Sequence, residues 1–235
     1  MIHYKHLKAD MKQIAREPIM LMLIFMPVFF FILFKLLILF LFPRIETWTG
    51  FDIVPYYSYL LSGVFVITPQ LLGTVTGFLM IDDRDENIYS LMSVTPMGYS
   101  GYMANRLLIP FTAGIFYTLF GYVVLSIYSI PFFNLLYISL LAGLEGIIAS
   151  LMLFQLSKDK VQGLTYAKTL GIFIAFCFAD LLNVRWVSVL ASLIPFYWPS
   201  RLIRHPATIL PVILALAVHL LWLFILIRRT KGRYT

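Results

Sequence analysis

The chain has 235 residues, of which 61% are hydrophobic and 12% charged, whereas about a quarter of the residues of an ordinary soluble domain are charged. This composition excludes a soluble domain, and apolar runs of about twenty residues, each able to cross ~30 Å of hydrocarbon, indicate a single polytopic membrane domain over residues 1–235. The formal net charge of +7 lies in short clusters beside those runs, which argues against nucleic-acid binding and is expected where Lys and Arg gather in cytoplasmic loops.

The amino-terminal residues 1–18 alternate apolar and polar positions at helical spacing and end at Pro18, which predicts an amphipathic helix on the membrane surface. The apolar run that follows is too long for the core of a cleaved signal peptide, so we interpret it as a span. Six membrane spans are predicted, at residues 19–42, 56–81, 107–129, 135–156, 164–182 and 208–227. The fold class is therefore all-α.

Clusters of Lys and Arg at both ends of the chain and at 158–168 predict that both termini are cytoplasmic. Two cytoplasmic termini require an even number of crossings. The apolar stretch 184–198 is short for a crossing, and we therefore expect segment 183–207 to enter the outer leaflet and return. Arg185, Arg201 and Arg204 then face outward, against the usual charge bias.

The segment 82–104 joins the second and third predicted spans and opens with a run of charged residues. Its apolar residues Ile88, Leu91 and Met92 lie on one side of a helix and its polar residues on another, which predicts a short amphipathic helix parallel to the membrane that ends near Pro96. The alternative is an ordinary solvated acidic loop.

This segment resembles the loop between the second and third spans of the ABC-2 family of ABC transporter permeases. In that family an acidic, basic, acidic triplet precedes a Leu-rich helix that ends in Thr-Pro. The matching residues here are Asp83, Arg84, Asp85, Leu91, Met92, Thr95 and Pro96. The sequence departs from the family pattern at Asn87, where Gly is usual, at Ile88 for Thr and at Ser90 for an acidic residue. The size and overall look are most similar to drug-export permeases, including the fluoroquinolone-export type.

The resemblance implies that segment 82–104 is the coupling helix that contacts a separate ATP-binding subunit. The implied ATPase-coupling residues are Asp83, Arg84, Asp85, Glu86, Ile88, Leu91 and Met92. The chain contains no G-x-x-x-x-G-K-[ST] sequence, so ATP and Mg²⁺ are expected on the partner, with no cofactor and no catalytic site in this chain. A second permease, identical or related, is expected to complete the export pathway for an amphipathic solute in the plasma (inner) membrane of a prokaryote.

Ionisable residues within the spans are candidates for function because they are costly to bury in a membrane. Glu145 and Lys35 are the candidate substrate-pathway residues, and Glu145 is a candidate to bind a cationic solute or to relay a proton. The alternative is that Glu145 makes an interhelical hydrogen bond or ion pair, for which Lys35 is the suggested partner. Lys35 is also placed where its ammonium can reach the outer interface. His219 is expected to be a helix-packing residue or a proton carrier, and Asp180 an interfacial cap.

Two other classes of function compete with a permease. A lipid or prenyl transferase would use Asp82, Asp83, Asp85 and Glu86 to hold Mg²⁺ against a diphosphate, but the sequence has no second acidic cluster to close such a site. An ion-coupled secondary carrier would show two inverted halves with broken helices, and only the 56–81 span is clearly interrupted, by Gly63, Pro69 and Gly73.

Overall fold

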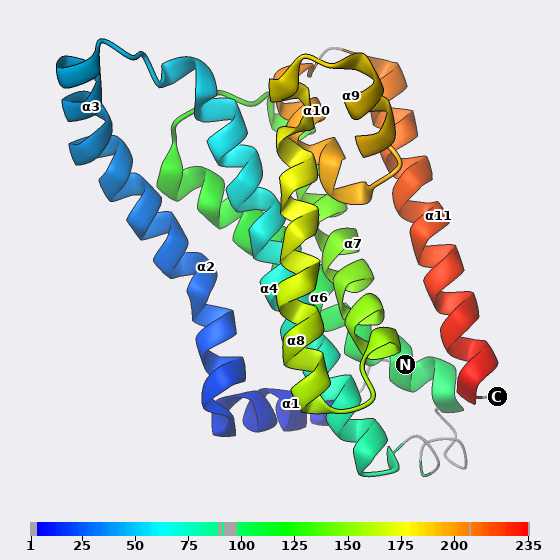
Figure 1. Ribbon diagram of the computed structural model, residues 1–235. Coiled ribbons are helices and arrows are strands. Elements are labelled where there is room, and N and C mark those ends of the chain that lie inside the picture. The colour runs from blue at the N-terminus through cyan, green and yellow to red at the C-terminus, as the bar shows by residue number, and fades with distance from the viewer. Residues whose placement is uncertain (1–3, 89–90, 92–97, 207, 235) are drawn as a thin grey trace.

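The computed structural model describes residues 4–88, 91, 98–206 and 208–234, and every regular element within these ranges is a helix (Figure 1). Six helical runs are long and apolar enough to cross a membrane, which confirms the all-α fold with six spans. The elements are α1 (Tyr4–Arg16), α2 (Pro18–Leu36), η1 (Leu37–Leu41), α3 (Phe42–Thr49), η2 (Val54–Tyr56), α4 (Tyr57–Asp85), α6 (Gly98–Leu125), α7 (Phe132–Leu156), α8 (Lys160–Leu170), η3 (Gly171–Leu182), α9 (Arg185–Ala191), η4 (Pro195–Tyr197), α10 (Trp198–Arg204) and α11 (Ile209–Tyr234).

The long helices form a bundle with two distinct ends (Figure 1). Helix α1 lies across one end, where α4, α7 and α11 finish and α2, α6 and α8 start. Helices α3, α9 and α10 lie at the opposite end. We call these the α1 end and the α9 end. Since α7 and α11 both start at the α9 end, they run parallel to each other.

Helices α4 and α7 form the centre of the bundle. In their most apolar stretches 89% and 72% of the residues are buried, against 11% in the first span. Glycines allow the central helices to approach closely: a Cβ added at Gly73 of α4 would lie 2.5 Å from the carbonyl oxygen of Gly146 on α7, and one added at Gly114 of α6 would lie 2.9 Å from the carbonyl oxygen of Ala142. Backbones packed this closely leave no space for even one methyl group.

The first span is longer than predicted, because the helix continues through the predicted loop 43–55 as far as Thr49. Pro43 lies within this run although proline removes a backbone donor and clashes with the preceding turn. The wide π-helical turn η1 precedes this point, and Pro43 falls in the first turn of α3, where proline is tolerated. Helix α3 ends at Gly50, whose φ of 68° is left-handed.

Most of the charged residues at the boundary of spans two and three lie in helices, with Glu86 in the turn that follows α4. Helix α4 extends to Asp85 and α6 begins at Gly98, nine residues before the predicted start of the third span. Charges were expected to mark loops because an unpaired charge is costly within a membrane. Here Asp83 and Arg106 neutralise each other across the two helices, so the helices continue.

The predicted re-entrant segment 183–207 contains two short helices, α9 and α10, connected through η4 at the α9 end (Figure 1). The chain enters this segment at Asn183, whose φ of 53° ends η3 in the left-handed conformation that asparagine tolerates. Trp186 and Leu190 of α9 are exposed. The segment thus folds back over one end of the bundle between the fifth and sixth span helices.

Candidate functional site

A buried cluster of charged residues joins α1, α4 and α6 at the α1 end. The Arg106 guanidinium donates from Nε to Asp83 Oδ2 and from Nη2 to Asp83 Oδ1, both at 2.7 Å, and its Nη1 forms an ion pair with Asp10. These three residues are only 7%, 1% and 6% exposed. The two-pronged geometry matches a guanidinium to a carboxylate, so α6 is fixed to α4 on one side and to α1 on the other.

Tyr102 completes this cluster from one turn before Arg106 on α6. Its hydroxyl donates to Asp83 Oδ2, and the Arg106 guanidinium carbon lies 5.7 Å from the centre of its ring. Residues four apart share one helix face, so α6 presents both side chains to the same carboxylate. We call Asp10, Asp83, Tyr102 and Arg106 the Arg106 cluster. Removing one member of such a buried ion pair costs about 3–5 kcal/mol, because the remaining charge is left uncompensated.

A second and more exposed group of charges lies beside it. Lys160, at the start of α8, forms ion pairs with Glu17 and with Asp82 Oδ2, the latter at 3.1 Å, and Gln13 Nε2 donates to the same oxygen at 3.4 Å. The side chains of Lys160 and Glu17 are about one-third exposed. These four residues, the Lys160 cluster, connect α1, the start of α2, α4 and α8, although solvent weakens their attraction.

Arg84 caps the end of α7 from the last turn of α4. It donates to the carbonyl oxygens of Phe154 at 3.3 Å, Ser157 at 2.8 Å and Lys158 at 2.7 Å, and it lies 5.2 Å from the centre of the Phe154 ring. The last carbonyl groups of a helix have no partner within the helix. Arg84 therefore satisfies the carbonyl of Phe154 in the last turn of α7 and those of the two residues after the helix, and it fixes the end of α7 to the end of α4.

The predicted ATPase-coupling residues divide into an internal and an external group. Asp83 and Arg84 are engaged within the chain, and Ile88 is half-buried against the hydrophobic core. Asp85, Glu86 and Leu91 are exposed, Leu91 by 63%. Met92 lies outside the described residues. Within the described part of this set, the side chains open to solvent are those of Asp85, Glu86 and Leu91.

Asn87 ends α4 with a φ of 57°. This left-handed conformation is accessible to glycine without cost and to asparagine more readily than to other residues. The sequence departs from the ABC-2 pattern at this position, where glycine is usual. The backbone geometry explains why asparagine is an acceptable replacement.

The structure separates the two predicted substrate-pathway residues. Glu145 is fully buried, with Oε1 3.5 Å from Nε2 of His219, and Lys35 donates to the carbonyl oxygen of Leu125 at 2.7 Å. The suggested ion pair between Glu145 and Lys35 is therefore wrong. Lys35 lies seventeen residues after the start of α2 and Glu145 eleven residues before the end of α7, so at 1.5 Å per residue their depths differ by about 9 Å.

At the α9 end, Asp180 does more than cap a helix. Its carboxylate accepts hydrogen bonds from Ser188 at 2.5 Å and from Tyr197 at 3.0 Å, and it pairs with Arg201 at 3.2 Å and with Arg204. Burial and the neighbouring Asp180 carboxylate raise the pKa of Tyr197 to about 12. We call these five residues the Asp180 cluster. Asp180 offsets part of the positive charge of Arg201 and Arg204 at this end, and Arg185 is not part of the cluster.

The acidic residues required by the lipid-transferase alternative do not converge. Asp82 contacts Lys160 and Asp83 contacts Arg106, while Asp85 is exposed. Among the residues that the structure describes, no group of three His, Cys, Asp or Glu side chains is placed to hold a metal ion. The arrangement supports cross-linking of helices rather than Mg²⁺ coordination.

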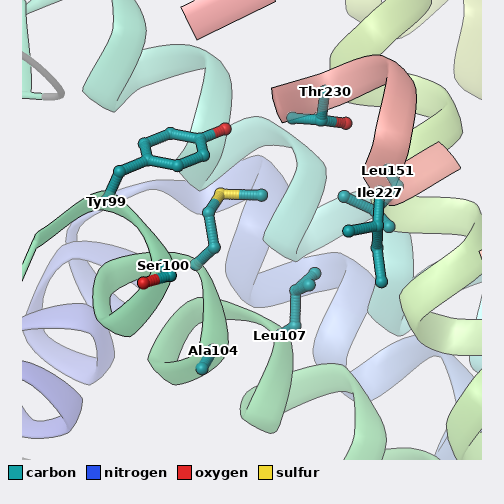
Figure 2. Close-up of a pocket in the computed structure, with 8 residues that line it drawn as sticks. Tyr99, Ser100, Ala104, Leu107, Leu151, Ile227 and Thr230 are labelled. Atoms are coloured by element: carbon teal, nitrogen blue, oxygen red, sulfur yellow. The ribbon is translucent and has the colours of Figure 1, made fainter. Parts of the chain in front are cut away.

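A cavity of about 240 Å³ lies between α6, α7 and α11 near the α1 end. Figure 2 shows Tyr99 and Leu107 on one side of it and Leu151, Ile227 and Thr230 on the other. Its lining is mainly apolar. Drug-sized ligands usually occupy pockets of ~300–1,000 Å³, so this cavity is smaller than a typical drug site.

Sequence reasoning missed the partners of the coupling segment: Asp10, Tyr102, Arg106, Glu17 and Lys160. One signal was available for Arg106. It is the last charged residue before the uncharged run 107–144, and Tyr102 precedes it by one helical turn. The identity of its partners depends on how α1, α4 and α6 pack, which a local pattern does not encode.

Residues 10–227 match the model of a family described as fluoroquinolones export permease protein Rv2686c-like. Two similar proteins, both named fluoroquinolones export permease, come from Mycobacterium tuberculosis strains CDC 1551 / Oshkosh and ATCC 25618 / H37Rv. Each is 27% identical over 198 residues, covering 82% of this chain and 77% of the relative. No solved structure gives a significant match.

Proposed function

This chain belongs to the Rv2686c-like family of fluoroquinolone export permeases, which are ABC-2 type permeases, and we propose that it is the membrane-spanning subunit of an ATP-driven exporter. The observation that supports this proposal is the position of the exposed residues Asp85, Glu86 and Leu91. Asp85 is the last residue of α4, and Glu86 and Leu91 follow it. At this end two ionic clusters and the hydrogen bonds of Arg84 connect α4 to α1, α6, α7 and α8. A displacement applied there is transmitted to most of the bundle.

ATP and Mg²⁺ are bound in this proposal by a separate cytoplasmic subunit. The chain has no phosphate-binding loop motif. The exposed Leu91 supplies an apolar contact to the ATP-binding subunit, and Asp85 and Glu86 supply polar contacts at its edge. Asp83 and Arg84 lie behind these contact residues and act through them, because they hold the coupling segment to α6 and α7. We therefore classify these two as positioning residues of the coupling segment.

The transport pathway is proposed to lie between two permease subunits, identical or related. The cavity between α6, α7 and α11 is too small for a drug-sized solute. The outer faces of α2 and α11 expose many large apolar side chains, which lipid and the second permease cover between them. An amphipathic aromatic solute of the fluoroquinolone type, after which the relatives are named, is the proposed substrate class.

The α1 end is proposed to face the cytoplasm of a prokaryotic cell, with the chain in the plasma (inner) membrane. The positive clusters at the two ends of the sequence and at 158–168 favour this orientation. It also places the exposed coupling residues on the side where ATP is available.

Purification from the native membrane in mild detergent tests the assembly. We expect an ATP-binding cassette protein to co-purify in near-equal amount, together with a second permease or a second copy of this chain. Vesicles that contain the complex should accumulate a fluorescent fluoroquinolone only when ATP is present. Accumulation driven by an ion gradient without ATP would instead support a secondary carrier.

Leu91→Arg tests the coupling contact directly. Because Leu91 is 63% exposed, the substitution should leave the unfolding temperature of the chain unchanged. It should reduce co-purification of the ATP-binding subunit and ATP-dependent transport at least about tenfold, since a charge replaces a central apolar contact.

Leu193→Arg is the matched control. Leu193 is 62% exposed and lies between α9 and η4, at the opposite end of the bundle. This variant should retain both the ATP-binding subunit and transport. If the two variants behave alike, residue 91 is not a coupling contact.

A further inference from the structure

Polar side chains of α7 contact α11, and the segment just before it at Pro206, at several depths of the bundle. Three of these contacts are hydrogen bonds to backbone carbonyl oxygens, from Asn134 to Pro206 at 2.9 Å, from Tyr137 to Val212 at 2.6 Å and from Gln155 to Leu226 at 2.6 Å. We call this line of contacts the α7–α11 seam. A carbonyl oxygen accepts a hydrogen bond at any ordinary pH, so these three contacts do not depend on protonation.

The fourth contact of the seam, between Glu145 and His219, is of a different kind. His219 Nδ1 lies 2.7 Å from the carbonyl oxygen of Ala215 on its own helix, so Nδ1 carries a hydrogen and donates it. Nε2 then faces Glu145 Oε1 at 3.5 Å. Both side chains are fully buried, and Nε2 and the two carboxylate oxygens have no hydrogen-bond partner within the described part of the chain.

The charge of this pair depends on how many protons it holds. With no proton on the carboxylate and a neutral imidazole, the pair carries one uncompensated negative charge. With both groups protonated it carries one uncompensated positive charge. With one proton between them it is neutral overall, whichever atom holds that proton. Only the last state avoids burying a net charge, which costs several kcal/mol.

The groups around the Glu145–His219 pair offer little further compensation for its net charge. The α7 residues beside Glu145 that pack against α4 and α6 include the glycines Gly143 and Gly146. The thiol of Cys177 on η3 lies within electrostatic range of Glu145, and Arg204 of α10 acts on that thiol in turn. Arg204 is itself paired with Asp180. His219 is therefore the direct partner of the carboxylate.

We propose that Glu145 and His219 form a binding site for a single proton inside the membrane-spanning core, and that occupancy by one proton holds α11 on α7. Loss of this proton, or gain of a second, leaves a buried net charge and weakens the seam at this depth. The proposal rests on this chain alone and does not depend on the identity of the transported solute or of the ATP-binding subunit.

Hydrogen exchange of the α11 backbone amides, measured on the full chain in lipid nanodiscs over a pH series, tests this site. Protection factors correct for the pH dependence of intrinsic exchange and report the free energy of local opening. In the native chain, protection of residues 215–223 should be maximal at intermediate pH. It should fall at least about tenfold towards both acid and alkaline pH, which corresponds to ~1.4 kcal/mol.

Two nearly isosteric substitutions distinguish the fall in protection at acid pH from the fall at alkaline pH. Glu145→Gln removes the group that becomes negative, so the alkaline fall should disappear and the acid fall remain. His219→Gln removes the group that becomes positive, so the acid fall should disappear and the alkaline fall remain. The double variant should show neither. Asn134→Ala, a control within the same seam, should lower protection at all pH values and keep both falls.

The outcomes that overturn the proposal are equally specific. A flat profile in the native chain would show that proton occupancy does not control the packing of α11. Both falls persisting in the double variant would show that other groups titrate. Neither result would bear on the transport proposal, which the co-purification and vesicle experiments test separately.

Discussion

The two ends of the bundle both hold buried carboxylates paired with arginines, yet they are organised in opposite ways. In the Arg106 cluster one guanidinium lies between two carboxylates that belong to different helices. In the Asp180 cluster one carboxylate lies among two arginines, a serine and a tyrosine, all within residues 180–204. The first arrangement connects helices distant in sequence. The second is mainly local, and it reaches a distant helix through the hydrogen bond that Arg204 donates to Tyr59 of α4 at 2.9 Å.

This difference indicates what each end does. In the proposed function the α1 end keeps several helices in fixed relation while the ATP-binding subunit displaces an exposed segment, and connections between distant helices suit that role. The α9 end has to return the chain between two spans, which local contacts accomplish. The comparison predicts that substitutions at the α1 end affect the whole bundle, whereas those at the α9 end act locally.

The largest expected effect is that of Arg106→Met. It removes the guanidinium between Asp83 and Asp10 and leaves buried carboxylate charge uncompensated, so we expect a loss of about 3–5 kcal/mol in the free energy of unfolding. The midpoint of thermal unfolding in detergent measures it. Arg201→Met at the α9 end is the matched control, because the Arg201 side chain is 38% exposed and should cost only about 0–1 kcal/mol. Equal losses would contradict the distinction between the two ends.

A smaller effect is expected at Asn87, where α4 ends. Asn87→Ala places a residue that disfavours the left-handed region at a φ of 57° and should cost about 1–2 kcal/mol of local stability. Amide exchange in the last turn of α4 measures this loss. Asn87→Gly relieves the backbone strain and should leave exchange within a few tenths of a kcal/mol of the native chain. If alanine and glycine behave alike, backbone conformation does not determine the residue here.

The smallest effect is expected for Lys160→Gln in the partly exposed Lys160 cluster. Partly solvated ion pairs contribute about 0–1 kcal/mol, so the unfolding midpoint should change little. Salt should lower the midpoint of the native chain slightly and that of the variant less, because screening removes an attraction that the variant lacks. A loss comparable to that of Arg106→Met would show that exposure does not weaken this cluster.

The number and type of the spans could be predicted from the sequence because hydropathy is a local property. The ends of the helices could not, because charges that normally mark a loop are neutralised here by partners on other helices. Asp83 illustrates this: its position in an acidic run suggests an exposed contact, while its burial beside Arg106 follows only from the packing of α4 on α6. Of the predicted coupling residues, Asp85, Glu86 and Leu91 are exposed, whereas Asp83 and Arg84 are engaged within the chain.

The partner of Glu145 likewise could not be predicted from the sequence. Both Glu145 and His219 stood out as ionisable residues within spans, and the sequence offered Lys35 as a partner equally well. The choice between the two depends on depth and on which helices are neighbours. Depth can be estimated once helix boundaries are known, but the contact between α7 and α11 is a property of the folded chain.

The close packing of glycines at Gly73 and Gly114 has a consequence for how proteins of this architecture can diversify. At these glycines an added Cβ would collide with a neighbouring backbone, so nearly every substitution there is destabilising. The inner helices therefore tolerate few of the changes that could alter solute specificity. The outward faces of α2 and α11 tolerate exchange of one large apolar residue for another. We expect variants that export different solutes to accumulate their changes on these two helices.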